Sequence, residues 1–180
     1  MEENKIKYNK IFMDKRKYKN NDYLSIIGLG GISIKGLGYK KSSNIISYSV
    51  DNGINWSQSG SGLPSTNDVR RACIAVTNDN PNVVYALFGN NDNGYYGLYK
   101  SSDEGNSWTQ QSSSPNLLGW STNGSDNGGQ AWYDLALTVS PLDEDIVFVG
   151  GVNCWKSDDG GVNWNLNTHW YGGGGANYMH

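Results

Sequence analysis

Asp51, Asp103 and Asp159 are the first residues of this chain whose spacing suggests chemistry, because each stands at the same place in a short recurring segment. A carboxylate can act as a general acid, a general base or a nucleophile when it projects into a cleft. Each aspartate is embedded in the pattern Ser-x-Asp-x-Gly-x-x-Trp, so a catalytic role has to be weighed against a role in building that segment.

The three octets share four residue types in register, and each type has a structural purpose. A carboxylate at the third position accepts hydrogen bonds from backbone N–H groups of its own turn, and Gly at the fifth adopts a positive φ. Trp at the eighth begins the next strand and covers the turn with its ring. Occupied lone pairs lower the pKa of such a carboxylate, so we predict structural roles. The marked residues are Ser49, Asp51, Gly53, Trp56, Ser101, Asp103, Gly105, Trp108, Ser157, Asp159, Gly161 and Trp164.

Asp134 is the remaining candidate for catalysis, and it follows Trp132 and Tyr133 at the start of a predicted strand. If that strand is the innermost of its sheet, the carboxylate faces a central funnel and could bind or react with a ligand. The alternative is a capped strand start, since perturbed carboxylates are often structural.

His169, Trp170 and Tyr171 form the densest cluster of aromatic and imidazole side chains, beside the glycines at 172–175. Trp and Tyr rings stack on sugar faces and on peptide side chains, which makes the three residues candidates for ligand binding. The alternative is a loop whose aromatic residues fill the core.

Metal and cofactor chemistry is not indicated. Cys73 and Cys154 lie in apolar runs without metal-ligand spacing, and the Asn- and Asp-rich loops at 90–94 and 123–128 lack a complete calcium pattern. The glycines at 172–175 lack the context of a phosphate-binding loop. We therefore expect no cofactor and no metal.

The elements that position these residues follow from the spacing of the octets. The aspartates are 52 and 56 residues apart, close to the length of one four-stranded propeller blade. Before the second and third octets, two apolar runs flank a polar turn, as in 72–88 and 135–149. Each unit is predicted to be strand, turn, strand, loop, strand, octet, strand. The fold class predicted is all-β, a partial β-propeller of two to three four-stranded blades.

Charge divides the chain near residue 41. Residues 1–41 hold ten basic and four acidic residues, a net charge of +6, whereas residues 42–180 hold four basic and thirteen acidic residues, a net charge of −9, and all seven Trp. We therefore separate a basic segment, 1–44, from an incomplete propeller, 45–180. An acidic body argues against nucleic-acid binding. The sequence has no apolar run long enough for a membrane span and no secretory signal.

The octets resemble the Asp-box, or BNR, repeat of sialidases, xyloglucanase-type glycoside hydrolases and sortilin-like (VPS10) ectodomain propellers. The resemblance covers residues 45–180 and implies a secreted or cell-surface parent protein. A sialidase requires three arginines that grip a carboxylate, but this region contains only Arg70 and Arg71. The sialidase interpretation therefore fails.

The resemblance leaves the function open between classes. We expect a ligand-binding propeller segment with a protein or glycan ligand, and the alternative is a fragment of a xyloglucanase-type glycoside hydrolase. A closed propeller needs about four blades or more, so we expect the rest of the propeller to lie outside this chain. A third alternative is a fragment with no function of its own, whose unpaired strand edges promote aggregation.

Overall fold

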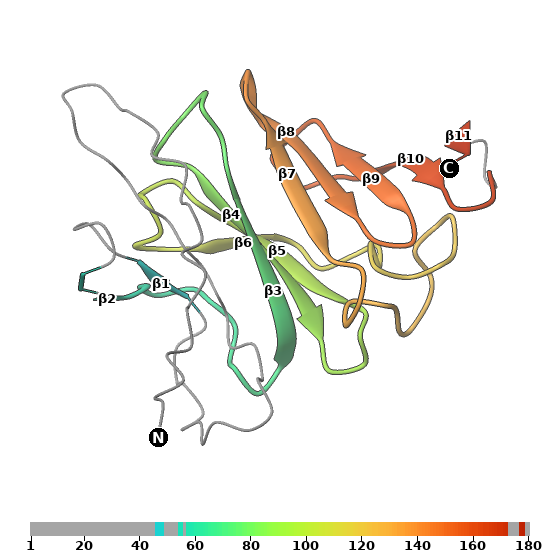
Figure 1. Cartoon of the computed structure of the whole chain (residues 1–180), viewed down its shortest axis with the longest axis horizontal. Coiled ribbons are helices and arrows are strands. Elements are labelled where there is room, and N and C mark those ends of the chain that lie inside the picture. Colours follow the sequence, from blue (N-terminus) through green and yellow to red (C-terminus); the bar gives the residue numbers. More distant parts are fainter. Residues whose placement is uncertain (1–45, 49–53, 56, 173–176, 179–180) are drawn as a thin grey trace, which may run out of the picture.

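The computed structural model describes residues 46–48, 54–55, 57–172 and 177–178, and within these ranges every regular element is a strand (Figure 1). None of the residues so described forms a helix long and apolar enough to cross a membrane. The strands are β1 (Ser47–Tyr48), β2 (Ser57–Gln58), β3 (Val69–Val76), β4 (Val84–Asn90), β5 (Tyr95–Ser101), β6 (Thr109–Ser112), β7 (Ala136–Ser140), β8 (Asp143–Gly150), β9 (Cys154–Ser157), β10 (Asn165–His169) and β11 (Asn177–Tyr178).

Two four-stranded antiparallel sheets make up most of the described chain. Their strand orders are β3-β4-β5-β6 and β7-β8-β9-β10, so each sheet is a meander in which sequential strands are neighbours. The short β11 adds to the outer edge of the second sheet, parallel to β10. The predicted all-β fold and the predicted order of elements within each blade are confirmed.

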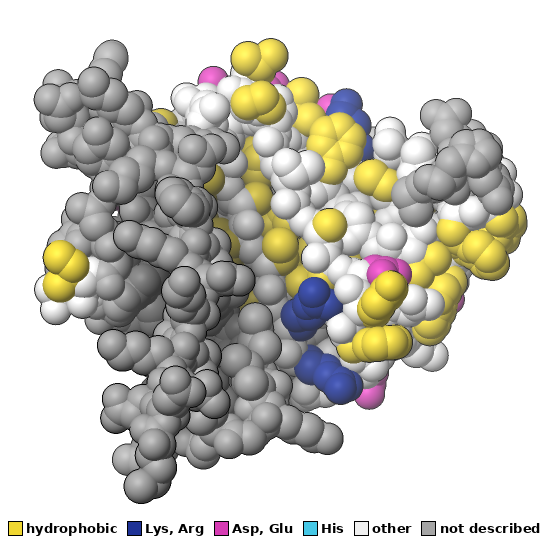
Figure 2. Space-filling view, in the orientation of Figure 1, with side chains coloured by type: hydrophobic (Ala, Val, Ile, Leu, Met, Phe, Trp, Pro, Cys, Tyr) yellow, Lys and Arg dark blue, Asp and Glu magenta, His cyan; other side chains and the backbone are white. Residues whose placement is uncertain are grey.

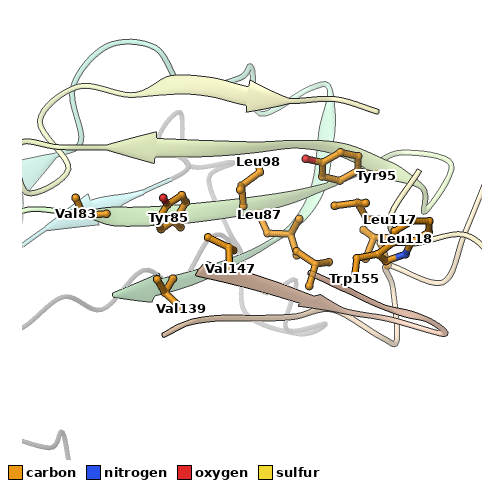
Figure 3. Close-up of a cluster of buried hydrophobic side chains, with 12 residues drawn as sticks. Val83, Tyr85, Leu87, Tyr95, Leu98, Leu117, Leu118, Val139, Val147 and Trp155 are labelled. Atoms are coloured by element: carbon orange, nitrogen blue, oxygen red, sulfur yellow. The ribbon is translucent and has the colours of Figure 1, made fainter. Parts of the chain in front are cut away.

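The two blades pack face to face, with the innermost strands β3 and β7 side by side (Figure 1). Apolar side chains from both sheets fill the space between them, as Tyr85, Leu87 and Val147 do in Figure 3. Each fully buried side chain of this size contributes about 1.5–3 kcal/mol. The core cluster consists of Val83, Tyr85, Leu87, Tyr95, Leu98, Leu117, Leu118, Ala131, Val139, Val147, Val149 and Trp155.

The opposite face of the β3–β6 sheet is also covered. Val84, Ala86 and Phe88 point to this side of β4, and Phe88 makes an edge-on ring contact with Tyr99, with centroids 5.4 Å apart. Ile46 packs in the same cluster. Ile46 and Leu63, which precede β3, therefore lie on the side where a preceding blade would pack.

Equivalent residues of the two blades face equivalent sides. Val76 pairs with Val84 in the first blade, and Val139 pairs with Val147 in the second, which confirms the predicted alignment of the two hairpins. Val84 and Val147 both point toward the preceding blade. This is the relation that a radial repeat requires.

Candidate functional site

The carboxylate of Asp103 is fully engaged by the turn that contains it. Its Oδ1 accepts hydrogen bonds from the Ser107 N–H at 2.8 Å and the Ser101 hydroxyl at 2.7 Å, and its Oδ2 accepts from the Ser107 hydroxyl at 2.6 Å. The Ser107 hydroxyl and N–H lower the pKa of Asp103 to about 2. A carboxylate held ionised by its own turn is poorly suited to donate a proton.

Asp159 repeats this arrangement in the third octet. Its Oδ1 accepts from the N–H groups of Asn163 at 2.9 Å and Val162 at 3.1 Å, and from the Ser157 hydroxyl at 2.7 Å. The Asn163 N–H is the main cause of a lowered pKa for Asp159. The marked residues of the first octet, Ser49, Asp51, Gly53 and Trp56, lie outside the described residues.

The glycines of the second and third octets have the positive φ that the sequence predicts, 91° at Gly105 and 89° at Gly161. The preceding position is also left-handed, with φ of 62° at Glu104 and 71° at Gly160. The sequence pattern did not predict this second position, because Glu gives no sign of a left-handed backbone.

The tryptophans of the second and third octets are each hydrogen-bonded across a blade boundary. Trp108 Nε1 donates to Ser59 Oγ at 2.7 Å, and Trp164 Nε1 donates to Ser112 Oγ at 3.0 Å. Each serine hydroxyl in turn donates to the carbonyl of the octet glycine, Ser59 to Gly105 and Ser112 to Gly161. Trp108 and Trp164 therefore have like surroundings. Neither serine is marked by the sequence pattern, because both lie outside the octets.

The loops after β6 and β10 meet at one edge of the two-blade unit. Both strands are last in their blades and run in equivalent directions, so residues 113–135 and 170–172 leave from the same end of the sheets. Asn153 Nδ2 donates to Gly119 O at 3.3 Å and to Ser121 O at 3.2 Å, which fixes the first loop against the second blade. We call these two loops the loop edge.

Large aromatic side chains are exposed on the loop edge. The exposed fractions are 40% for Trp120, 59% for Trp132, 69% for Tyr133, 48% for Trp170 and 57% for Tyr171. The other large exposed hydrophobic residues in the described part of the chain are the aliphatic Ile54, Leu142 and Val162, in hairpin and octet turns. On the face of the molecule seen in Figure 2, some of the exposed hydrophobic side chains lie beside Lys or Arg side chains. Trp120, Trp132 and Tyr133 are not among the residues predicted from the sequence to contact a ligand.

His169 supports the loop edge from below its surface. It is fully buried, and its Nε2 lies 3.0 Å from the carbonyl oxygen of Trp120. The Tyr171 ring packs edge-on against the His169 ring, with centroids 4.1 Å apart, and Trp170 packs edge-on against Tyr171 at 4.7 Å. Of the three residues predicted to bind ligand, Trp170 and Tyr171 present accessible rings and His169 does not.

Asp134 lies just before β7, and its environment is a loop rather than a charged cleft. Its N–H donates to Gln130 O at 2.8 Å. With the Gln130 amide oriented to satisfy both neighbours, its nitrogen donates to Asp134 Oδ2 at 3.3 Å while its oxygen accepts from Trp120 Nε1 at 2.9 Å. Asp134 thus connects through Gln130 to an exposed tryptophan.

Asp126 is the other carboxylate that shapes the loop edge. Its Oδ2 accepts from the N–H groups of Trp120 at 2.8 Å and Ser121 at 2.6 Å, and from the Ser121 hydroxyl at 2.6 Å. Burial acts to raise the pKa of Asp126, but the bonds from Ser121 and Trp120 lower it overall. Asp126 therefore orders the loop that carries Trp120.

Arg71 anchors the same loop through its guanidinium group. Its Nη1 donates to the carbonyl oxygens of Ala131 at 3.2 Å and Tyr133 at 3.0 Å. The backbone on either side of Trp132 is thereby tied to β3. The neighbouring Arg70 is also exposed.

The described part of the chain contains no group of three or more His, Cys, Asp and Glu side chains placed to hold a metal ion. Cys73 and Cys154 are free and half-buried, and burial raises the pKa of the Cys154 thiol.

A shallow hollow of about 300 Å³ lies at the second octet, away from the loop edge. Its lining is polar and includes the hydrogen-bonded carboxylate of Asp103. The lining residues are Lys100, Ser102, Asp103, Ser107, Thr109 and Gln111.

No family model matches the sequence, and no curated protein matches it. Solved structures that resemble the chain include β-propellers. YCF48 bound to D1 peptide is 15% identical over 68% of this chain and 34% of its own, with a TM-score of 0.45. YCF48 from Cyanidioschyzon merolae is 17% identical over 68% of this chain and 30% of its own, with a TM-score of 0.41. The GH74 enzyme of Niastella koreensis is 26% identical over 52% of this chain and 14% of its own, with a TM-score of 0.38. The chain thus spans about a third or less of the length of these proteins.

Proposed function

We propose that this chain is a ligand-binding segment of a β-propeller and that it contacts its ligand through the loop edge. The observation that carries the proposal is the gathering of Trp120, Trp132, Tyr133, Trp170 and Tyr171 on two loops that meet at one edge. Two ring contacts, Trp132–Tyr133 at 5.4 Å and Trp170–Tyr171 at 4.7 Å, make four of these residues pairs, and exposed apolar patches mark interaction sites whereas scattered single residues do not.

Hydrogen bonds hold the backbone of the loop that carries Trp120, Trp132 and Tyr133, which favours binding. Asp126 and Asn153 fix the first loop by hydrogen bonds, and Arg71 holds the backbone around Trp132. Rings held in place before binding lose little conformational freedom when the ligand arrives. In this proposal the exposed rings contact the ligand directly, and the buried His169 holds Tyr171 and the loop in place.

A polypeptide is the favoured ligand. Trp, Tyr and Arg are the residues enriched at the centres of protein–protein contacts, and Arg70 and Arg71 are exposed beside the aromatic loops. A glycan, whose apolar sugar faces also stack on Trp and Tyr, is the alternative ligand. A secreted or cell-surface location is part of this proposal and rests on the resemblance of the octets.

The test is a binding selection against two sets of probes, phage-displayed random peptides and arrayed polysaccharides. Probes retained by the full chain are titrated against Trp132→Ala, Tyr171→Ala and, as a matched control, Leu142→Ala, which removes a side chain that is 85% exposed but lies in the β7–β8 turn. We expect each aromatic variant to weaken binding roughly 10–30-fold and the control to leave it unchanged. Binding that tolerates both aromatic substitutions would refute the proposal.

The hydrolase alternative depends on two carboxylates that face each other across a cleft. Its candidate, Asp134, is bonded to Gln130, and the nearby Asp126 is saturated by three donors. Release of reducing sugar from xyloglucan by the full chain, abolished in Asp134→Asn, would support hydrolysis over binding.

A further inference from the structure

Asparagine followed by glycine occurs four times in the chain, at Asn52, Asn93, Asn123 and Asn127. Asparagine is one of the thermally labile residues of proteins. In this dipeptide the backbone nitrogen of the glycine can attack the side-chain amide, because glycine has no Cβ to hinder the approach. Asn52 lies outside the described residues. The other three lie in the β4–β5 hairpin and in the loop after β6, which leave the first blade at the same end.

The reaction consumes only water and involves no oxidation or reduction. The glycine nitrogen gives up its proton and forms a bond to the asparagine Cγ, the bond from Cγ to Nδ2 breaks, and the amide nitrogen leaves as ammonia. The product is a five-membered succinimide ring. Water then opens the ring at either carbonyl, which gives aspartate or isoaspartate. In isoaspartate the main chain runs through Cγ, so it is longer by a methylene group and carries a new free carboxylate.

Asn93 is held back from this reaction by its hairpin. The Gly94 N–H, which would have to attack, donates to Asn90 Oδ1 at 2.8 Å, and the Gly94 carbonyl accepts from the Asn90 N–H at 2.9 Å. The side-chain oxygen of Asn93 is itself buried. A buried and hydrogen-bonded amide reacts with solvent only when the structure around it opens.

Asn123 is exposed, but its turn is closed by two hydrogen bonds. The Gly124 N–H donates to the Ser121 carbonyl at 3.3 Å, and Asn123 Oδ1 accepts from the Ser125 N–H at 3.2 Å. Both the attacking nitrogen and the side chain to be attacked are therefore engaged with other residues. Each bond has to break before the ring can close.

Asn127 has neither restraint. Its side chain is exposed, and neither its amide nor the Gly128 N–H forms a hydrogen bond with any residue that the structure describes. The nucleophile and the carbon that it attacks are therefore both available. Among the three described asparagines that precede glycine, Asn127 is the one placed to react.

The carbonyl groups on either side of Asn127 anchor the loop. Asn116 Nδ2 donates to the carbonyl oxygens of Asp126 and Gly128, both at 2.8 Å. Asn116 Oδ1 accepts from the N–H of Tyr95 at 2.8 Å. One side-chain amide thus ties residues 126–128 to the start of β5.

Asp126 connects this anchor to Trp120, because its Oδ2 accepts from the backbone N–H groups of Trp120 and Ser121. A methylene group inserted between residues 127 and 128 changes the spacing of the two carbonyls that Asn116 binds. The new carboxylate also lies next to that of Asp126 in the chain, and like charges this close repel each other. Modification of Asn127 therefore weakens the attachment of the segment that carries Trp120.

We propose that Asn127 is a site of spontaneous modification, at which attack by the Gly128 nitrogen produces isoaspartate and loosens the Trp120 segment of the loop edge. The first part of this inference is chemical and independent of what the protein binds. The consequence for binding rests on the proposed function, since it makes the affinity of the loop edge for its ligand decline as the protein ages.

The first experiment locates the modification. The full chain is incubated in mildly alkaline buffer at physiological temperature, digested with chymotrypsin and analysed by tandem mass spectrometry with electron-transfer fragmentation, which distinguishes isoaspartate from aspartate. We expect a mass gain of about 1 Da to accumulate at Asn127 at least about fivefold faster than at Asn93 or Asn123, because the hydrogen bonds at those two sites protect them.

Incubation in urea separates the effect of structure from that of sequence. All three asparagines precede glycine, so their rates in the unfolded chain should agree within about twofold. Asn127→Gln is the matched variant for the folded chain, because glutamine would have to close a six-membered ring and reacts much more slowly. This variant should leave the conversion rate of Asn123 unchanged.

The second experiment measures the consequence for the loop. Hydrogen exchange of the amides in residues 117–122 should be at least about threefold faster in the aged natural chain than in the fresh chain, and unchanged in aged Asn127→Gln. Peptides retained in the binding selection should bind the aged natural chain about 3–10-fold more weakly and bind aged Asn127→Gln as before. If the chain retains no probe, the proposed function fails, and the mass and exchange measurements still decide this inference.

Two results would overturn the chemical part. The first is conversion of Asn93 or Asn123 in the folded chain as fast as that of Asn127, and the second is an Asn127 that reacts in urea but not in the folded chain. Conversion of Asn127 with unchanged exchange in residues 117–122 would overturn the structural consequence, because the loop would then tolerate the modification.

Discussion

At the scale of single residues, the octet aspartates illustrate how a carboxylate becomes structural. Asp103 and Asp159 each accept hydrogen bonds from the Ser two residues earlier and from backbone N–H groups on the far side of the turn. A charge satisfied in this way stabilises the turn only while it remains ionised. The stability of the fold should therefore depend on pH in acid.

The pKa of Asp103 sets the pH range in which its contribution to stability is lost. The pKa of Asp103 is about 2, below the ordinary value of 3.8, so its contribution is complete above about pH 4 and is lost as the pH falls toward 2. We expect the difference in urea midpoint between the natural chain and Asp103→Asn to be constant above about pH 4 and to shrink between about pH 4 and 2.

Urea titrations followed by tryptophan fluorescence at several pH values measure this difference. Glu104→Gln, in the same turn and exposed, is the matched control and should show little difference at any pH. A difference for Asp103→Asn that persists undiminished to pH 2 would contradict the charge-based explanation.

At the scale of elements, a serine hydroxyl of the first blade hydrogen-bonds the octet tryptophan of the second. Ser112 Oγ contacts Trp164 Nε1, the Gly161 carbonyl and the Tyr95 hydroxyl, so three polar groups depend on it. Buried polar groups left without a partner cost more than the bond itself contributes.

We therefore expect Ser112→Ala to destabilise the chain by about 1–3 kcal/mol, measured as the free energy of unfolding in urea. Ser113→Ala, at the next and exposed position, is the control and should change the free energy by less than about 0.5 kcal/mol. Equal stability of the two variants would mean that the hydrogen bond between Trp164 and Ser112 contributes nothing to the packing of the blades.

At the scale of the whole molecule, the two blades are held by an apolar core with an ion cluster at its rim. Lys100 lies over the Tyr85 ring at 5.5 Å and reaches Glu144 and Asp145 of the neighbouring blade. Its side chain is only 16% exposed, so these charges are less screened than an ordinary surface pair.

Replacing this lysine should loosen the contact between blades. We expect Lys100→Met to lower the free energy of unfolding by about 1–2 kcal/mol. Lys156→Met, which removes the equivalent lysine of the second blade and a pair within that blade, should cost less than about 0.5 kcal/mol in the natural chain. Equal losses of unfolding free energy in the two variants would show that the ion pairs of Lys100 with the next blade stabilise the fold no more than the pair within one blade.

Much of the blade architecture follows from sequence alone. The octet spacing predicts the repeat, alternating apolar runs predict β3, β4, β7 and β8, and Gly105 and Gly161 predict the left-handed turns. These features are local, because a turn needs particular residues within a few positions of one another.

The composition of the loop edge and the serine–tryptophan hydrogen bonds at the blade boundaries depend on the tertiary structure. Trp120, Trp132, Tyr133, Trp170 and Tyr171 are exposed on two loops that leave the same end of the sheets, and Ser59 and Ser112 form hydrogen bonds with tryptophans about fifty residues away. His169 looks like a contact residue in the sequence, yet it is buried beneath Tyr171. Sequence records which side chains are present, whereas packing between distant strands determines which of them face water.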